Sequence, residues 1–175
     1  PASVARAICD VARETFDCDL VALFAIEGER LRLLARSPYL AGSPELRVME
    51  PSPELQEELA ESLLPQFVAD IREPFGLRVP RAITADPEQV SAVRAPVLLE
   101  EQPVALLAMS WARRMPEPGR GELGVVQRFA EHAAVALAQA QRAQAQREVA
   151  TLYRRFQASL SPAVNVTADQ IKVAT

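Results

Sequence analysis

The chain has 175 residues, of which 49% are hydrophobic and 24% are charged. This composition is typical of one globular domain with or without an appended segment. The net charge of −4 predicts no basic surface for nucleic acid. No apolar run approaches the ~18 residues of a membrane span, and the first residues lack a signal-peptide pattern, so we expect a cytoplasmic protein without membrane contact.

The first elements predicted are a helix and a hairpin. Residues 3–16 have an amphipathic pattern typical of a helix, whose expected inward face is Val4, Ile8, Val11, Ala12 and Phe16. The apolar run 20–26 predicts a buried strand, and the alternation over 30–37 predicts a second one. Glu27-Gly28-Glu29 between them predicts the turn of a hairpin.

The middle of the chain is rich in proline. A helix is predicted over 53–64, with Ser52 as its N-cap and Pro53 at its first position. A short strand is predicted over 66–70. Residues 71–88 show no periodicity, and a segment of this length inside a domain is more often a functional loop than a simple connection.

A second hairpin is predicted over 90–115, with its turn near Glu100-Glu101-Gln102-Pro103. Pro96 indicates a strand edge or a bulge at that point. A long helix is predicted to begin near Gly121 and to meet no helix breaker before Pro162. Its first part has an inward stripe of apolar residues, namely Val126, Phe129, Ala130, Ala133 and Leu137.

The later part of this helix has a different character. Residues 138–147, AQAQRAQAQR, favour a helix but contain no apolar side chain larger than alanine. A second apolar stripe follows, and it is out of heptad phase with the first. We expect a homodimer through this stripe, with the alanines allowing close helix approach; a solvated single helix is the alternative. The dimer residues predicted are Val149, Leu152, Tyr153, Phe156 and Leu160.

The order helix, hairpin, helix, variable loop, hairpin, long helix resembles that of a GAF domain. The resemblance is most specific in APVLLEEQPVALLAMSW and in MPEPGRGELGVVQRFAEHAAVALAQA, although Val104-Ala105 stands where the family often has a glycine. It implies an α+β fold: a central antiparallel sheet, terminal helices on one face, and any ligand on the other. The domains implied are a GAF-like sensor over 3–140, a helical linker over 141–162 and an extended or disordered tail over 163–175.

A second resemblance concerns REVATLYRRFQASLSPA, residues 147–163. This stretch resembles the junction before the catalytic domain of bacterial PPM-type serine phosphatases, with Phe156 and Ser161 replacing two leucines. The resemblance implies an output domain of the same polypeptide with phosphatase activity. That reaction needs several aspartates around metal ions, and after Pro162 the only acidic residue is Asp169, so we expect this chain itself to be no enzyme.

The familiar ligands of GAF domains are not expected. His132 falls off the inward stripe, which disfavours haem, and residues 71–88 contain no cysteine for a bilin. The cyclic-nucleotide motif is absent, since the only asparagine and lysine are Asn165 and Lys172. Cys9 and Cys18 lie too far N-terminal for the methionine-sulfoxide reductase pattern and are expected to be reduced thiols. No catalytic or metal-binding residues are predicted.

The function predicted is a non-catalytic regulatory domain that dimerises and relays a signal to an output domain. Two alternatives stay open, a receptor for an unknown small molecule and a dimerisation module without a ligand. For a ligand pocket, aromatic side chains suit stacking and arginines suit an anionic group. The residues nominated are Phe24, Arg36, Phe67, Phe75, Arg94 and Trp111.

Overall fold

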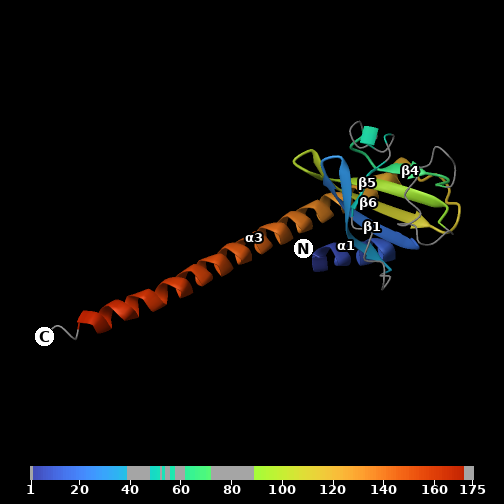
Figure 1. Cartoon of the computed structure of the whole chain (residues 1–175). Coiled ribbons are helices and arrows are strands. Elements are labelled where there is room, and N and C mark those ends of the chain that lie inside the picture. Colours follow the sequence, from blue (N-terminus) through green and yellow to red (C-terminus); the bar gives the residue numbers. More distant parts are fainter. Residues whose placement is uncertain are drawn as a thin grey trace. The chain divides into compact units, whose positions relative to one another are not determined.

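The computed structural model describes residues 2–38, 48–51, 53, 56–57, 62–71 and 89–171, with side chains as far as residue 159. The chain divides into two units, Pro1–Ala138 and Gln139–Thr175. The elements in chain order (Figure 1) are α1 (Ala2–Thr15), β1 (Leu20–Glu27), β2 (Arg30–Ser37), β3 (Val48–Met49), β4 (Gln66–Val68), β5 (Ser91–Leu99), β6 (Gln102–Trp111) and α3 (Arg120–Ile171).

The first unit is built on one six-stranded sheet of order β3-β2-β1-β6-β5-β4. Every pair of neighbouring strands is antiparallel. The central strands β1 and β6 are apolar on both faces because their sequences, LVALFAIE and QPVALLAMSW, contain few polar residues. Both faces of such a sheet need cover from water.

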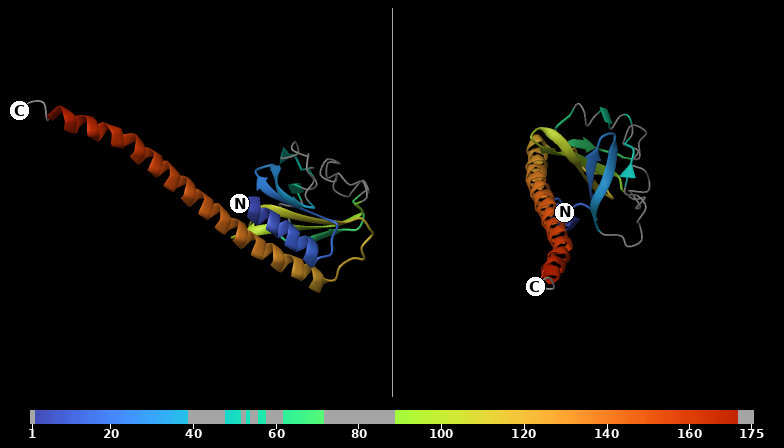
Figure 2. Two further views of the ribbon diagram at one scale, coloured as in Figure 1. Left: turned by 90° about the horizontal axis from the view of Figure 1, so that it is seen from below. Right: turned by 60° about the vertical axis from the view of Figure 1, so that its left-hand side comes forward.

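One face is covered by α1 and the beginning of α3 (Figure 2). The buried residues of α1 are Ala5, Ile8, Cys9 and Ala12, and those of α3 include Val126, Ala130 and Leu137. Many of these side chains are small, so the helices approach the strands closely. At the edge of this core the rings of Phe16 and Phe129 meet edge to face, with centroids 5.5 Å apart. The predicted α+β architecture is therefore confirmed.

The opposite face has a smaller apolar cluster, formed by Ala22, Phe24, Leu31 and Leu106. Ile26, Leu33 and Ala108 pack against it. For clarity we call the first side the helix face of the sheet and this side the open face. The name refers only to the absence of α1 and α3.

Both predicted hairpins are present, and their turns are tight. Gly28 has a φ of 62°, which glycine adopts without strain. In the second turn two glutamates take left-handed conformations, with φ of 51° at Glu100 and 63° at Glu101. Beside Pro96 the register of β5 and β6 shifts between Val97 and Leu98, so the bulge that the proline indicated lies next to it.

Helix α3 begins at Arg120, and capping contacts stabilise this N-terminus. The Gly119 amide donates to Glu122 Oε2 over 2.7 Å, and the Glu122 and Leu123 amides both donate to the Gly119 carbonyl oxygen. A glutamate that reaches back to the N-cap amide is half of a capping box. The stripe predicted for the first part of α3 is confirmed, and His132 is exposed.

Three local predictions were wrong. Val11 is 51% exposed, because the face of α1 that meets the sheet passes through Ile8, Cys9 and Ala12. Residues 62–65 are not helical, so the helix expected over 53–64 does not reach its predicted end; half of that range lies outside the described residues. Helix α3 continues to Ile171, so the tail expected to be extended from residue 163 is helical there although Pro162 removes one backbone donor.

The second turn generates a stability prediction. Left-handed conformations cost a residue with a side chain about 1–2 kcal/mol, and asparagine followed by glycine is the preferred pair for a two-residue turn of this kind. The double substitution Glu100→Asn, Glu101→Gly should therefore raise the free energy of unfolding by about 1–2 kcal/mol in urea denaturation. Gly28→Ala should lower it, because φ is positive there too. An unchanged urea midpoint for the double variant would contradict the prediction.

Candidate functional site

The open face contains one row of residues that crosses five strands, and it ends on β4, where Gln66 lies opposite Arg94 of β5. Arg36 of β2 lies opposite Ala22 of β1, Ala22 lies opposite Ala108 of β6, and Ala108 lies opposite Arg94 of β5. Residues directly opposite each other in antiparallel strands point to the same face. The row therefore has one arginine on each side of the two alanines, and we call it the arginine row.

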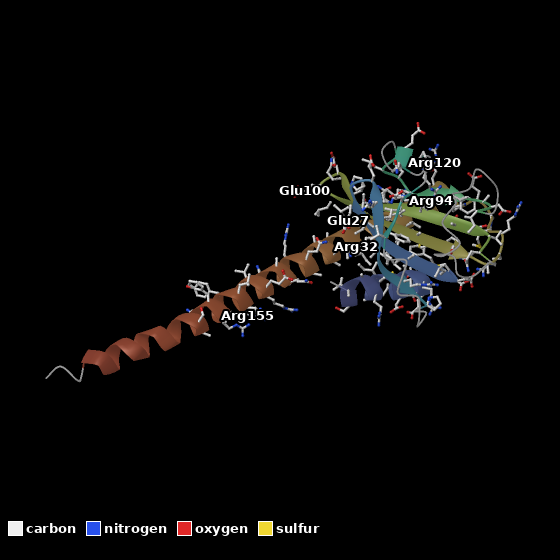
Figure 3. The ribbon with its side chains drawn as sticks, viewed as in Figure 1. Glu27, Arg32, Arg94, Glu100, Arg120 and Arg155 are labelled. Carbon is white, nitrogen blue, oxygen red and sulfur yellow. The ribbon has the colours of Figure 1, made fainter. Side chains whose placement is uncertain are left out.

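Both guanidinium groups are partly buried. Arg36 Nε, and Arg94 Nε and Nη1, are shielded from solvent. Each arginine also interacts elsewhere in the chain, so neither is without a partner. Figure 3 shows Arg94 on β5, away from the hairpin ends marked by Glu27 and Glu100.

No acidic side chain lies on the open face within the described strands. The neighbouring row on one side is apolar, with Phe24 opposite Leu106 and Leu106 opposite Pro96. On the other side Ser110, which is 8% exposed, lies opposite Leu20 and Ala92. The open face therefore has two arginines, with the small side chains of Ala22 and Ala108 between them and a row of apolar residues beside them.

Five of the six nominated pocket residues lie in the described part of the chain, and they divide between the two faces of the sheet. Phe24, Arg36 and Arg94 lie together on the open face. Trp111 belongs to the main core on the helix face and Phe67 packs against that core, so these two residues do not lie with the three on the open face. Phe75 lies outside the described residues.

Trp111 has a structural role instead. Its indole Nε1 donates to the Asp17 carbonyl oxygen over 2.8 Å. The Ala112 amide donates to Asp19 Oδ2 over 2.7 Å, and Arg113 Nη2 donates to Asp17 Oδ2 over 3.1 Å. These contacts fasten the turn between α1 and β1 to the end of β6, which explains why Asp17 keeps a φ of 47°.

No pattern in the sequence predicted the polar cluster at the start of β5. The Ser91 hydroxyl donates to the Ala69 carbonyl oxygen over 2.8 Å and accepts from the Met115 amide over 2.9 Å. Arg114 Nη2 donates to the buried Asp70 Oδ2 over 2.9 Å. These bonds join residues 22 to 44 positions apart, and only the tertiary fold reveals such partners. They fix both ends of the chain segment between β4 and β5.

The two cysteines are free and buried. Burial raises the pKa of the Cys9 thiol to about 12, with a further rise from the charge of Asp10. Burial likewise raises the pKa of Cys18 to about 12. Thiols held in the protonated form are poor nucleophiles and poor metal ligands, so we assign them to the core.

Within the described ranges, His, Cys, Asp and Glu form no group of three that could hold a metal ion. In the same ranges no helix combines the length and the apolarity that crossing a bilayer requires.

An antiparallel sheet with both terminal helices on one face defines an α+β class of fold. The sequence profile of the GAF domain matches residues 1–137, and the chain belongs to that family. No curated protein matches the chain.

Solved structures agree in fold. The GAF domain of a phosphoenolpyruvate-protein phosphotransferase from Coxiella burnetii superposes with a TM-score of 0.66 at 14% identity, covering 82% of this chain and 86% of that one. A GAF domain/HD domain protein from Geobacter sulfurreducens gives 0.63 at 14% identity, with 80% and 93% covered. The PixJ GAF domain from Thermosynechococcus elongatus gives 0.60 at 20% identity, with 87% and 92% covered.

The raised thiol pKa values predict weaker folding at alkaline pH. An unfolded thiol ionises near pH 8.5, whereas each folded thiol keeps its proton to about pH 12. The unfolded state therefore binds fewer protons in that window, and each thiol should lower the free energy of unfolding by about 1.4 kcal/mol per pH unit. Urea denaturation at pH 7.5, 9 and 10 measures this slope. The double variant Cys9→Ala, Cys18→Ala should show a shallower slope; equal slopes would contradict the assignment.

Proposed function

We propose that this GAF domain is a non-catalytic regulatory domain of the bacterial cytoplasm that dimerises and relays a signal through α3 to an output domain. GAF domains are in general sensor or regulatory domains that can bind small molecules. The observation that supports the proposal is the continuity of α3. Its first part is packed in the core of the sheet domain, and the same helix continues for 52 residues in all, which is about 78 Å at ~1.5 Å per residue.

The apolar stripe of α3 supports dimerisation. Val149, Leu152, Tyr153 and Phe156 are each 63–65% exposed and recur at helical spacing. Leu160 continues the spacing in the sequence. A contiguous apolar stripe facing water usually marks an interface. Burying one such side chain contributes about 1.5–3 kcal/mol, so a few of them offset the cost of association.

The helix between the core and the stripe suits a relay. From Gln139 to Glu148 the side chains are alanine, glutamine, arginine and glutamate, and most of them are exposed. An internal bond from Gln144 Nε2 to Glu148 Oε1 over 2.8 Å stabilises this helical stretch. Alanines allow close approach of two helices but bury little area, so two arrangements of a dimer can be close in free energy.

We further propose that the output domain is a metal-dependent serine/threonine phosphatase. The support is the resemblance of Phe156-Gln157-Ala158-Ser159-Leu160-Ser161-Pro162 to the phosphatase junction. In this scheme the partners are a second copy of the chain and the output domain of the same polypeptide. We expect no haem, bilin or cyclic nucleotide as ligand.

A second candidate function is a receptor for a small molecule, and the arginine row favours it. Arginine side chains on one face of a sheet are able to bind an anionic group of a ligand, and Arg36 and Arg94 share the open face while also interacting with other residues of the chain.

Dimerisation can be tested by light scattering. The unmodified chain should be a dimer, and Phe156→Ser should raise the dissociation constant by tenfold or more because it removes a large apolar side chain from the stripe. Gln141→Ser should leave it within about twofold. A matched pair sharpens the test: Val149 lies on the stripe and Val125, also exposed, lies on the sheet-packed part of α3. Equal effects of Val149→Ser and Val125→Ser, or a monomeric parent, would rule out the stripe as the interface.

The proposal of a phosphatase output domain leads to a separate prediction. The 175-residue chain should not hydrolyse a phosphoserine peptide with Mn²⁺ or Mg²⁺ present, because it lacks the aspartates that hold the metal ions. The natural polypeptide that contains this chain should hydrolyse the same peptide, and chelation of the metal should abolish the activity. Hydrolysis by the isolated chain would refute the first statement, and an inactive full polypeptide would refute the second.

A further inference from the structure

The second unit of the chain, from Gln139 onward, contains the later part of α3, and its apolar side chains follow a seven-residue repeat. Val149 and Phe156 are seven residues apart, and Tyr153 lies four residues after the first and three before the second. This spacing is that of the core positions a and d of a coiled coil. One repeat before Val149 stands Arg142, which is exposed. We name the column formed by Arg142, Val149 and Phe156 the heptad column.

Arg142 differs from the neighbouring charged residues in its position in the repeat. The other charged residues between positions 139 and 159 are Arg147, Glu148, Arg154 and Arg155. With Tyr153 at position a, all four fall at positions b and c, on the outer side of a helix pair. The flanking positions e and g are occupied by alanine, glutamine, leucine and serine. In this range of the sequence, Arg142 is therefore the single charged residue at a core position.

This placement of Arg142 holds in both registers that the stripe allows. The apolar residues also fit a register with Val149 at position a and Leu152 at position d. Arg142 precedes Val149 by one full repeat in either case, so it keeps a core position. Arg147 falls at position b in one register and at position f in the other, and both positions lie outside the core. Since Arg142 and Arg147 are both exposed arginines of one helix, they form a matched pair for experiment.

We propose that in the dimer Arg142 faces Arg142 of the second copy, and that this contact opposes pairing of the helices on the N-terminal side of the stripe. The inference rests on the proposed function, because a relay to one output domain per chain requires both helices to leave the pair at the same end. In such a parallel, in-register pair each core residue faces its own counterpart. Two like charges that face each other at an interface lower the affinity.

The heptad column gives the two parts of this helix different tendencies to pair. From Val149 onward the stripe favours association, because pairing buries apolar side chains. From Gln139 to Gln146 the core positions of the first register hold glutamine and arginine, which add no apolar burial. Pairing in this part is opposed by Arg142, so its closed and separated states can be close in free energy. A small difference in how the two states fit the rest of the protein then shifts the balance between them.

The matched arginines test the proposal by light scattering on the 175-residue chain at constant ionic strength. Arg142→Leu should lower the dissociation constant of the dimer by tenfold or more, because an apolar layer replaces two facing charges. Arg147→Leu makes the same chemical change outside the core and should leave the constant within about threefold. Leucine and arginine have similar helix propensity, so neither variant should disturb the helix. Equal effects of the two substitutions, or a weaker dimer with Arg142→Leu, would overturn the proposal.

Disulfide formation tests the parallel arrangement separately. Residues that face each other at a core position are close enough for a disulfide, so Arg142→Cys should link two copies under mild oxidation and Arg147→Cys should not. The native thiols of Cys9 and Cys18 are buried, so they should not compete. A dimer without the Arg142→Cys link would refute this inference alone, provided that Phe156→Ser still weakens the dimer. A monomeric parent would refute the proposed dimer as well, so the two failures are distinguishable.

Discussion

The pairing of β1 with β6 is the interaction on which the rest of the domain depends. These two strands lie at the centre of the sheet, and their register runs from Leu20 opposite Ser110 to Ala25 opposite Ala105. Because side chains alternate along a strand, the paired residues of β1 and β6 contribute side chains to both faces of the sheet. Val21, Leu23, Leu107 and Met109 point to the helices, whereas Ala22, Phe24, Leu106 and Ala108 point to the open face. A change of one residue in this register would exchange the two sets.

Local patterns were enough to predict the hairpins, the first stripe of α3 and the class of fold, since each depends on neighbours in sequence. The division of the pocket residues between faces was not predictable, because it depends on register. Irregularities between Leu23 and Phe24 and between Val97 and Leu98 shift the alternation. The alignment of Arg36 with Arg94 needs three successive strand pairings to be known. The hydrogen bonds of Ser91 and Asp70 were not predictable either, because their partners are brought close only by the tertiary fold. Val11 was wrongly predicted to face the sheet because α1 has more apolar residues than its inward face includes.

The alanine-rich composition of α3 has two consequences in two environments. Against the sheet, Ala130, Ala133, Ala134 and Ala138 are at most 8% exposed, and their small size lets the helix lie close to the strands. Beyond Ala138 the same kind of residue faces water and contributes helix propensity without burial. A helix in water that packs on nothing is only marginally stable. The exposed residues from Val149 to Phe156 are therefore the natural place for the helix to gain stability by association.

The open face and the proposed relay share β1 and β6. Ala22 lies between Val21 and Leu23, and Ala108 lies between Leu107 and Met109; all four neighbours belong to the core against which α1 and α3 pack. The interior is close-packed, so a shift of either strand must be accommodated by the helices on the other face. A ligand can change the position of α3 only by binding one arrangement of the strands more tightly than another.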